Sequence, residues 1–269
     1  MVRIVVQHIW PEAVPFLTDC RLLWSGQEAL FRRVARSDTV VEQSFVPTSP
    51  YNTMYSFLEL LNDVELVKGI IRAERKGFDG AVIACGNDPG LKEAREATSF
   101  PVVAVTEAAM HLACMLGSKF AAIVVDKRCI PLVERNIRQY GLEGRAIAHR
   151  PVRSIEYAEH MPQWYGSAEF TREHVIPKFE AVAKACIDDG AEVIATACGG
   201  FGALALAGYN KIGGTEVPIV NNLVAGLKLA EMLVDIRQTL GVSTSKHLSY
   251  SCLPRDLFDE LTRPFLGEI

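Results

Sequence analysis

The sequence predicts an α/β protein built from two similar lobes, each with a parallel β-sheet flanked by helices. Three observations predict this fold: strand-like and helix-like segments alternate, several strands are apolar on both faces, and part of the sequence repeats. The 269 residues, 49% hydrophobic and 22% charged, are enough for one large domain or two small ones. That composition is typical of a globular protein and excludes a disordered tail, a collagen-like fibre and a coiled coil.

Short segments rich in β-branched residues recur along the chain. They are Arg3–Gln7, Thr39–Phe45, Gly80–Ala84, Pro101–Val105, Phe120–Val125, Ile147–Val152, Glu192–Ala197 and Pro218–Val220. Several of them lack the apolar–polar alternation of a half-exposed strand. This indicates strands that are buried on both faces of a parallel sheet.

Segments with helical spacing separate these strands. They are Asp63–Lys76, Thr106–Leu116, Thr171–Asp188 and Leu223–Leu240. Strands that alternate with helices favour a parallel sheet with right-handed crossovers. We expect the last of these helices to cross back onto the first lobe, where the N-terminal strands need cover.

An internal repeat is the most informative feature of the chain. Phe78–Cys85 parallels Ala191–Cys198 at an offset of 113, Phe100–Val103 parallels Val217–Val220 at 117, and Ile4–Gln7 parallels Ile123–Asp126 at 119. Three matched segments in one order and at similar offsets predict a duplication. The expected result is two pseudo-symmetric Rossmann-like lobes, the first from residues 1–106 plus 221–269 and the second from 107–220.

Charge and hydropathy exclude several classes of partner. The net charge of -4 and the pI of about 5.9 disfavour nucleic-acid binding, since no basic patch stands out. The apolar segments fall short of the roughly 18 residues that span a bilayer, so no membrane partner is expected. Met1–Gln7 lacks the features of a secretion signal, which predicts a cytoplasmic protein.

The cysteines and histidines do not indicate a metal or cofactor site. The seven cysteines contain no C-x-x-C pair, and the histidines lack metal-ligand spacing. No nucleotide-binding glycine motif follows the first strand. We therefore expect no metal, no cofactor and free thiols in a reducing compartment. The partners that we expect are a small-molecule substrate and further copies of the same chain in a homo-oligomer.

Two cysteines occupy equivalent positions in the repeat. Cys85 ends one predicted strand and Cys198 ends another, and glycine follows each of them. Ligands of open parallel sheets bind beyond the carboxyl ends of the strands, so we expect both thiols to face one cleft between the lobes. Loop N–H groups and the start of a following helix favour a thiolate there. The other cysteines have no such counterpart and are predicted to be structural.

Two thiols on opposite sides of one molecule suit proton transfer at carbon. One thiolate removes a proton from a carbon next to a carbonyl, and the other group, as a thiol, returns a proton to the opposite face. The configuration inverts without a cofactor. The site must stabilise the charge that develops on the carbonyl, and the thiol pKa must be tuned toward the working pH.

The substrate is expected to contact residues that follow the predicted strands. The candidates are Gln7, Tyr51, Gly86, Asn87, Asp88, Asp126, Lys127, Gly199 and Gly200. Asn87 is expected to bind a carbonyl or ring nitrogen, whereas Asp88 fits a turn or helix cap equally well. Tyr51 either covers the substrate or packs on the surface. The segment with Trp164 and Tyr165 forms a lid or a subunit contact, and the sequence does not choose between them.

Several of these segments resemble one known family. They are Phe78–Cys85, Asp88–Leu91, Ala94–Glu96, Pro101–Val103, Glu107–Ala109, Leu116–Gly117, Tyr140–Leu142 and Gly190–Ile194. Together they resemble the aspartate/glutamate/hydantoin racemase superfamily, most closely its hydantoin and allantoin racemase branch, from about residue 55 to 235. The resemblance implies two lobes, a cleft between them, cofactor-independent proton transfer by two cysteines, and substrate binding by the loops after each cysteine.

The chain departs from the family pattern at several pocket positions. Gly86–Asn87 and Gly199–Gly200 stand where amino-acid racemases of the superfamily usually carry Thr or Ser, which argues against aspartate or glutamate. Gln7–Pro11 replaces the usual Asn-Pro-Asn loop, and Asp126–Lys127 replaces a common hydroxyl residue. These changes alter the pocket wall, which leaves open a substrate other than a simple 5-substituted hydantoin, and they leave the cysteine pair unchanged. A hydantoin-like cyclic amide is the expected substrate.

Two other functions remain open at this point. Relatives in the superfamily isomerise maleate or decarboxylate arylmalonates with one or both of these cysteines, and a dicarboxylate substrate would favour such a reaction. Alternatively, a two-lobed protein of this kind binds a small molecule without turnover. Ligand-protected, reactive cysteines would favour an enzyme over a passive binding protein.

Overall fold

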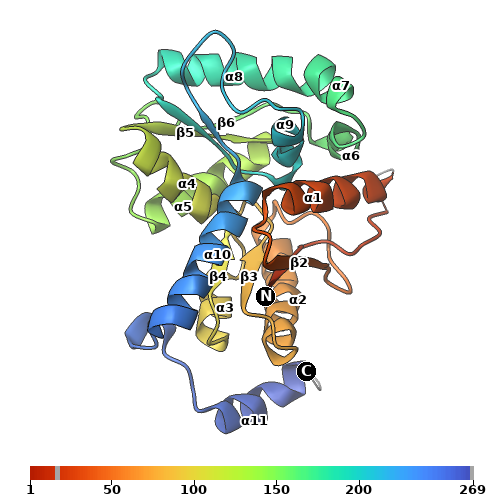
Figure 1. The fold of residues 1–269 in the computed structure, drawn as a ribbon, viewed down its shortest axis with the longest axis vertical. Helices are drawn as coiled ribbons and strands as arrows, with labels where there is room; N and C mark the ends of the chain where they lie inside the picture. Colours follow the sequence, from red (N-terminus) through yellow and green to blue (C-terminus); the bar gives the residue numbers. More distant parts are fainter. Residues whose placement is uncertain (16–18, 267–269) are drawn as a thin grey trace.

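The computed structural model describes residues 1–15 and 19–266. Within that part of the chain, the strands form two four-stranded sheets, and every strand pair in them is parallel. Figure 1 shows the two sheets in separate lobes, with helices packed on both. The predicted two-lobed α/β fold is confirmed.

The two sheets have the same strand order. The first is β2 (Thr39–Ser44), β1 (Val2–Gln7), β3 (Gly80–Ile83), β4 (Val102–Ala104), and the second is β6 (Val152–Ser154), β5 (Phe120–Val124), β7 (Val193–Thr196), β8 (Ile219–Val220). The repeated sequence segments supply β1 and β5, β3 and β7, and β4 and β8. All residues of β3 and β7 are buried, as both-face burial in a parallel sheet requires.

One strand lies further along the chain than the sequence predicts. The prediction was Ile147–Val152, but β6 begins at Val152. Arg150 has a φ of 48°, and Pro151 has no backbone N–H to donate. This turn delays the start of the strand.

The helices flank the sheets and also meet between the lobes (Figure 1). Their bounds are α1 (Cys20–Val34), α2 (Ser56–Arg75), α3 (Leu91–Ala97), α4 (Val105–Leu116), α5 (Ile130–Gln139), α6 (Met161–Trp164), α7 (Ala168–Phe170), α8 (Ile176–Asp188), α9 (Gly202–Leu206), α10 (Asn222–Leu240) and α11 (Arg255–Leu266). Within the described residues, no helix is long and apolar enough to cross a membrane.

Helix α10 packs on α4 and on strands β1, β3 and β4. Gly226 permits this approach, since a Cβ there would lie 2.8 Å from a methyl of Val105 and 3.2 Å from one of Val82. We therefore propose that residues 1–106 and 221–269 form the first lobe and residues 107–220 the second. Positions 267–269 of that division lie outside the described residues.

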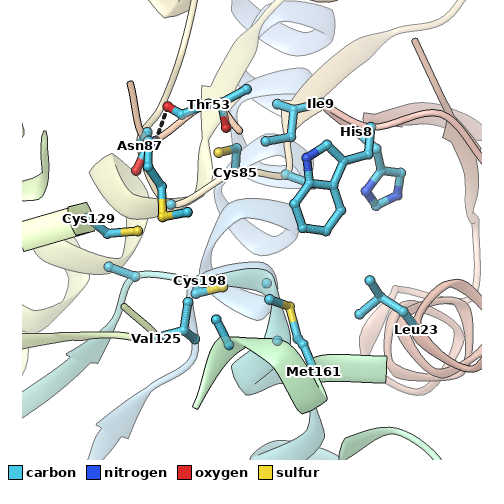
Figure 2. Close-up of a pocket in the computed structure, with 18 of the residues that line it drawn as sticks. His8, Ile9, Leu23, Thr53, Cys85, Asn87, Val125, Cys129, Met161 and Cys198 are labelled. Atoms are coloured by element: carbon cyan, nitrogen blue, oxygen red, sulfur yellow. Dashed lines mark hydrogen bonds between the residues drawn. The ribbon is translucent and has the colours of Figure 1, made fainter. Parts of the chain in front are cut away.

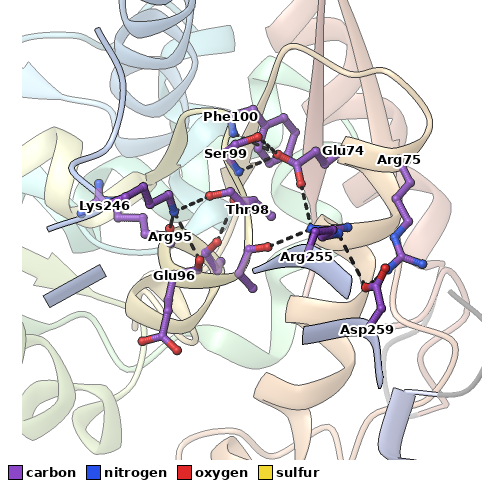
Figure 3. Close-up of polar contacts among 12 residues, drawn as sticks. Glu74, Arg75, Arg95, Glu96, Thr98, Ser99, Phe100, Lys246, Arg255 and Asp259 are labelled. Carbon is purple, nitrogen blue, oxygen red and sulfur yellow. Dashed lines mark hydrogen bonds and ion pairs between the residues drawn. The ribbon is translucent and has the colours of Figure 1, made fainter. Parts of the chain in front are cut away.

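The C-terminal segment is held at the end of the first lobe that is remote from the second lobe (Figure 1). Arg75 pairs with Asp259 at 2.6 Å, and Arg255 pairs with Glu74 at 3.6 Å, which holds α11 against α2 (Figure 3). Lys246 donates to the carbonyl of Thr98 at 2.5 Å, just beyond α3. These contacts keep α11 away from the region between the lobes.

The lobes touch at the loops that follow β3 and β7. A Cβ built on Gly86 would lie 1.9 Å from the carbonyl oxygen of Ala197, and one built on Gly199 would lie 3.9 Å from the carbonyl oxygen of Ala84. The contact is thus reciprocal, because the glycine after each cysteine faces the residue before the other cysteine. Glycine at position 86 is the residue that permits the backbones to approach this closely.

Helix α5 and Tyr140, the residue that follows it, add polar contacts between the lobes. Asn136 donates from its side chain to the carbonyl of Asn87 at 2.9 Å, and the Tyr140 hydroxyl donates to Asp88 at 2.8 Å. Arg135 pairs with Glu59 at 3.2 Å. The loop that carries Cys85 is therefore fixed by the second lobe as well as by its own.

We expect Gly86→Ala to destabilise the protein. Its methyl group would collide with backbone rather than with a movable side-chain end, so the lobes must shift apart, at a cost of about 1–3 kcal/mol. The measurement is the free energy of unfolding in urea. Gly144→Ala is the matched control, because Gly144 has nothing within 4 Å of the added methyl. Equal stability of the two variants would contradict the close contact.

Candidate active site

A pocket lies between the lobes, and its wall is mostly apolar (Figure 2). It is lined by His8, Ile9, Trp10, Leu23, Trp24, Gln27, Tyr51, Thr53, Met54, Ala84, Cys85, Gly86, Asn87, Val125, Cys129, Ala158, Met161, Ala197, Cys198, Gly199 and Gly200. The lining comes from both lobes and includes the residues that directly follow β3 and β7. This is the edge at which parallel sheets place their ligands.

Cys85 and Cys198 enter this pocket from opposite lobes. Each follows the last residue of its strand by two positions, Ile83 in β3 and Thr196 in β7. Figure 2 shows the two side chains on facing walls of the pocket. The equivalent positions in the repeat therefore become facing positions in space.

Burial raises the pKa of both thiols. The pKa of Cys198 rises to about 11, and the pKa of Cys85 rises well above its usual value. The backbone N–H groups of Asn87 and Gly200 stabilise the Cys85 and Cys198 thiolates, respectively, and oppose this rise only in part. The sequence correctly indicates thiolate-favouring loop amides, but loss of water contact is the larger effect.

The two thiols also influence each other electrostatically. A negative charge on Cys198 raises the pKa of Cys85 further. Two thiolates in one desolvated pocket repel each other, so the pair favours states with no charge or with a single charge. The singly charged state contains one thiolate and one thiol.

A third thiol, Cys129, lines the same pocket, and the sequence prediction that it is structural missed this position. It lies directly before α5, three residues after Asp126. Burial raises its pKa to about 12, and a charge on Cys198 raises it further. The sequence feature that could have identified Cys129 as a pocket residue is its position shortly after the predicted strand Phe120–Val125, which belongs to the repeat.

Five of the predicted substrate contacts line the pocket. They are Tyr51, Gly86, Asn87, Gly199 and Gly200. The Asn87 side chain donates to the carbonyl of Thr53 at 3.4 Å, which ties the Cys85 loop to the segment before α2. Tyr51 has a φ of 61° in that segment.

The structure places the other predicted contacts outside the pocket lining. Gln7 turns toward α2, where a Cβ on Gly69 would lie 2.3 Å from its side-chain oxygen, and its amide donates to the His8 carbonyl at 3.0 Å. Asp126 forms an ion pair with Arg128 at 2.7 Å, and Lys127 is exposed. The end of a strand brings its backbone to the cleft, but successive side chains point to opposite faces of the sheet. A side chain at that end therefore does not have to face the cleft.

Asp88 is a helix cap and lies outside the pocket lining. Its carboxylate accepts from the N–H groups of Thr106 at 2.9 Å and Glu107 at 2.7 Å, at the start of α4, and from Tyr140. Burial nevertheless raises its pKa to about 7. Of the two interpretations that the sequence left open, the structure shows the cap.

Helix α1 supplies pocket residues that the sequence analysis did not identify. Leu23, Trp24 and Gln27 lie on its buried face. His8 packs beside Trp24, with ring centroids 4.8 Å apart, and burial lowers the pKa of His8 to about 4. His8 is therefore a neutral part of the wall at pH 7.

The segment around α6 closes the pocket next to Cys198. Met161 lines the pocket and Trp164 is buried in the core. The Tyr165 hydroxyl donates to the carbonyl of Gly199 at 2.5 Å, and its ring lies over Gly26 of α1. This segment therefore links the second lobe to α1.

Fold and site together define a two-lobed α/β protein with two thiols facing one apolar pocket. Among the described residues, no group of three or more His, Cys, Asp or Glu side chains is arranged to hold a metal ion. The polar groups in the pocket wall are amides, hydroxyls, thiols, the indole N–H groups of two tryptophans and the imidazole of His8. Groups of these kinds can hydrogen-bond a small neutral molecule, and thiols can take up and release protons.

Comparison with known proteins gives the family. Residues 27–230 match the model described as Asp/Glu/Hydantoin racemase. The chain is 32% identical over 227 residues to the hydantoin racemase of Pseudomonas sp. (strain NS671), covering 84% of each chain. It is 31% identical to the hydantoin racemase of Paenarthrobacter aurescens over 222 residues, 81% of this chain and 87% of that one. The chain belongs to the Asp/Glu/hydantoin racemase family.

A solved structure agrees with this membership. Allantoin racemase from Klebsiella pneumoniae superposes with a TM-score of 0.74 at 26% identity, over 95% of each chain. The resemblance drawn from the sequence is confirmed. So is the prediction of an enzyme of the racemase type, since the relatives are named racemases. The expected homo-oligomer stays a prediction.

We expect the alkylation of Cys85 and Cys198 by iodoacetamide to keep rising with pH. The reagent attacks the thiolate, so the rate at a thiol with a raised pKa climbs about tenfold per pH unit across neutral and mildly alkaline pH. Mass spectrometry of the modified peptides measures each site, with exposed Cys252 as the reference for reagent decay. A plateau below about pH 9 at Cys198 would contradict its raised pKa.

Proposed function

We propose that this protein is a cofactor-independent racemase in which Cys85 and Cys198 transfer protons at a carbon next to a carbonyl. The observation that carries the proposal is the position of both thiols, at equivalent strand ends on opposite lobes, in one pocket. Family membership supports the same reaction type.

The reaction moves two protons in sequence. The thiolate of one cysteine takes the proton from the carbon, so that a C–H bond breaks, an S–H bond forms and an enolate-like anion remains. The thiol of the other cysteine gives its proton to the opposite face of the carbon and becomes the thiolate. The carbon is inverted, and the cysteines have exchanged protonation states.

The electrostatics of the pair suit this sequence. Mutual repulsion in a buried pocket disfavours two thiolates, so the charged pair contains one base and one acid. A raised pKa makes each thiolate a strong base, which helps with a carbon acid. A substrate that fills the pocket excludes water, and the backbone N–H groups of Asn87 and Gly200 remain to stabilise the thiolates.

The pocket chemistry favours a neutral cyclic amide. Among the described lining residues there is no Lys or Arg, and His8 is neutral at pH 7, so a carboxylate would find no cation there. The side-chain oxygen of Gln27 is buried and has no hydrogen-bond partner in the described structure. A ring N–H of a hydantoin would satisfy that acceptor. The relatives that are named hydantoin racemases point to the same substrate class.

The apolar wall favours a hydantoin with an apolar 5-substituent. Ile9, Trp10, Leu23, Trp24 and Met161 supply a broad hydrophobic surface. The polar ureido group of allantoin would lose its hydrogen bonds to water against such a wall, which costs free energy. We therefore propose an aromatic or large aliphatic substituent, although one structural relative is an allantoin racemase.

The alternatives make different use of the pocket. Maleate isomerisation and arylmalonate decarboxylation require dicarboxylates, which the lack of a cation among the described lining residues disfavours. A passive binding protein requires no facing pair of thiols. Turnover of each substrate class distinguishes these possibilities.

Replacing either cysteine by alanine should abolish racemisation, with a loss of at least about a hundredfold. In D2O, Cys85→Ala and Cys198→Ala should each still exchange the proton of one enantiomer only, and opposite enantiomers, because one base remains on one face. Proton NMR and optical rotation on single enantiomers of 5-benzylhydantoin measure both effects. Cys252→Ala, at an exposed position, is the matched control. Racemisation at the native rate in either pocket variant would reject the two-base mechanism.

The substrate class is tested on a panel of single enantiomers. We expect kcat/KM for 5-benzylhydantoin to exceed kcat/KM for allantoin at least about tenfold, because apolar pockets discriminate between substrates by a factor of this order. Phenylmalonate should release no CO2, and maleate should not isomerise. Met161→Ala should raise KM for 5-benzylhydantoin about three- to tenfold while leaving 5-methylhydantoin nearly unchanged. A preference for allantoin or a dicarboxylate would overturn the assignment.

A further inference from the structure

The thiolate of each pocket cysteine is stabilised by the N–H of one particular peptide group. The backbone N–H of Asn87 lowers the pKa of Cys85, and the backbone N–H of Gly200 lowers the pKa of Cys198. In both loops the donor lies two residues after the cysteine. The peptide groups are therefore Gly86–Asn87 in the first lobe and Gly199–Gly200 in the second.

The carbonyl end of the first peptide is held by a buried hydroxyl. Thr106, at the start of α4, donates from Oγ1 to the carbonyl oxygen of Gly86 at 2.9 Å. Its side chain has no exposure to solvent. Thr106 is not a pocket-lining residue, so a molecule in the pocket would meet Cys85 and not Thr106.

The carbonyl end of the second peptide is also held by a hydroxyl. Tyr165 donates to the carbonyl oxygen of Gly199 at 2.5 Å, and Gln27 donates to the same oxygen at 3.4 Å. A threonine from the first lobe and a tyrosine from the second thus perform the same contact in the two halves of the repeat.

Peptide planarity connects these hydroxyls to the sulfurs. In a trans peptide the C=O and N–H groups point in opposite directions from one rigid plane, so an anchored oxygen fixes the direction of the N–H. A hydrogen bond to the carbonyl also polarises the peptide and strengthens its N–H as a donor. A hydroxyl on one side of the peptide can therefore stabilise a thiolate on the other.

We propose that Thr106 and Tyr165 are paired positioning residues, each of which orients and polarises the peptide whose N–H stabilises one of the two thiolates. Thr106 acts on Cys85 through Gly86–Asn87, and Tyr165 acts on Cys198 through Gly199–Gly200. The inference rests on the proposed function for its catalytic meaning. The hydrogen-bond chains themselves do not depend on the substrate or on turnover.

The experiment is a crossed pair of variants in the intact protein. Thr106→Val and Tyr165→Phe each remove one hydroxyl with little change in shape, and Thr106→Ser keeps the hydroxyl as the matched control. Iodoacetamide alkylation of Cys85 and Cys198 is followed by peptide mass spectrometry as a function of pH. This measurement reports the ionisation of each sulfur whether or not the protein racemises a hydantoin. A failure of this inference can therefore be distinguished from a failure of the proposed function.

The expected result is selective. Thr106→Val should slow alkylation of Cys85 at fixed pH about three- to tenfold and move its pH profile upward, and leave Cys198 unchanged. Tyr165→Phe should do the same to Cys198 and leave Cys85 unchanged. Thr106→Ser should match the unsubstituted protein. With an active preparation, the same variants should lower kcat more than they change KM.

Other results would overturn the proposal. They are unchanged rates in both variants, equal slowing of both sulfurs in either variant, or a Thr106→Ser protein that behaves like Thr106→Val. Circular dichroism checks that each variant is folded. Should Thr106→Val fail to fold, Thr106→Ala takes its place, and the Tyr165→Phe arm tests the second chain by itself.

Discussion

The close contact between the loops after β3 and β7 determines the rest of the site. With its Cβ position 1.9 Å from the carbonyl oxygen of Ala197, residue 86 has no room for a side chain. That contact sets the separation of the lobes and hence the pocket into which Cys85 and Cys198 project. Asn136 and Tyr140 hold the same loop by hydrogen bonds, so the geometry of the pocket depends on backbone and side chains of both lobes.

The chemistry of the thiols follows from a balance between burial and local amides. Removal from water raises the pKa of both sulfurs, and one N–H group for each sulfur opposes that rise. In the proposed reaction this balance matters, because a fully stabilised thiolate is too weak a base for a carbon acid and an unsupported one does not form. The carbonyl oxygens of the same two peptides accept hydrogen bonds from Thr106 and Tyr165. The direction of each N–H group is therefore set by a residue that does not line the pocket.

The fold and the pair of thiols were predictable because they depend on local pattern and on the repeat. Strands such as β3 and β7 are apolar throughout, and duplication places Cys85 and Cys198 at equivalent ends. Side-chain direction was not predictable, since Gln7 turns toward Gly69 and Ser44, which are distant from it in the sequence. Helix α1 has buried residues at helical spacing, but the polar Gln27 interrupts its apolar stripe, and the pocket residues on it were missed.

The shared charge of the thiol pair has a consequence for how successive reactions follow one another. In the proposed mechanism the free protein exists in two protonic forms, one with the anion in the first lobe and one with it in the second. Each form accepts only one mirror image of the substrate and is converted into the other on release of product. The protonation state of the two cysteines in the free protein would thus depend on which enantiomer was released last, until the sulfurs exchange their proton through solvent.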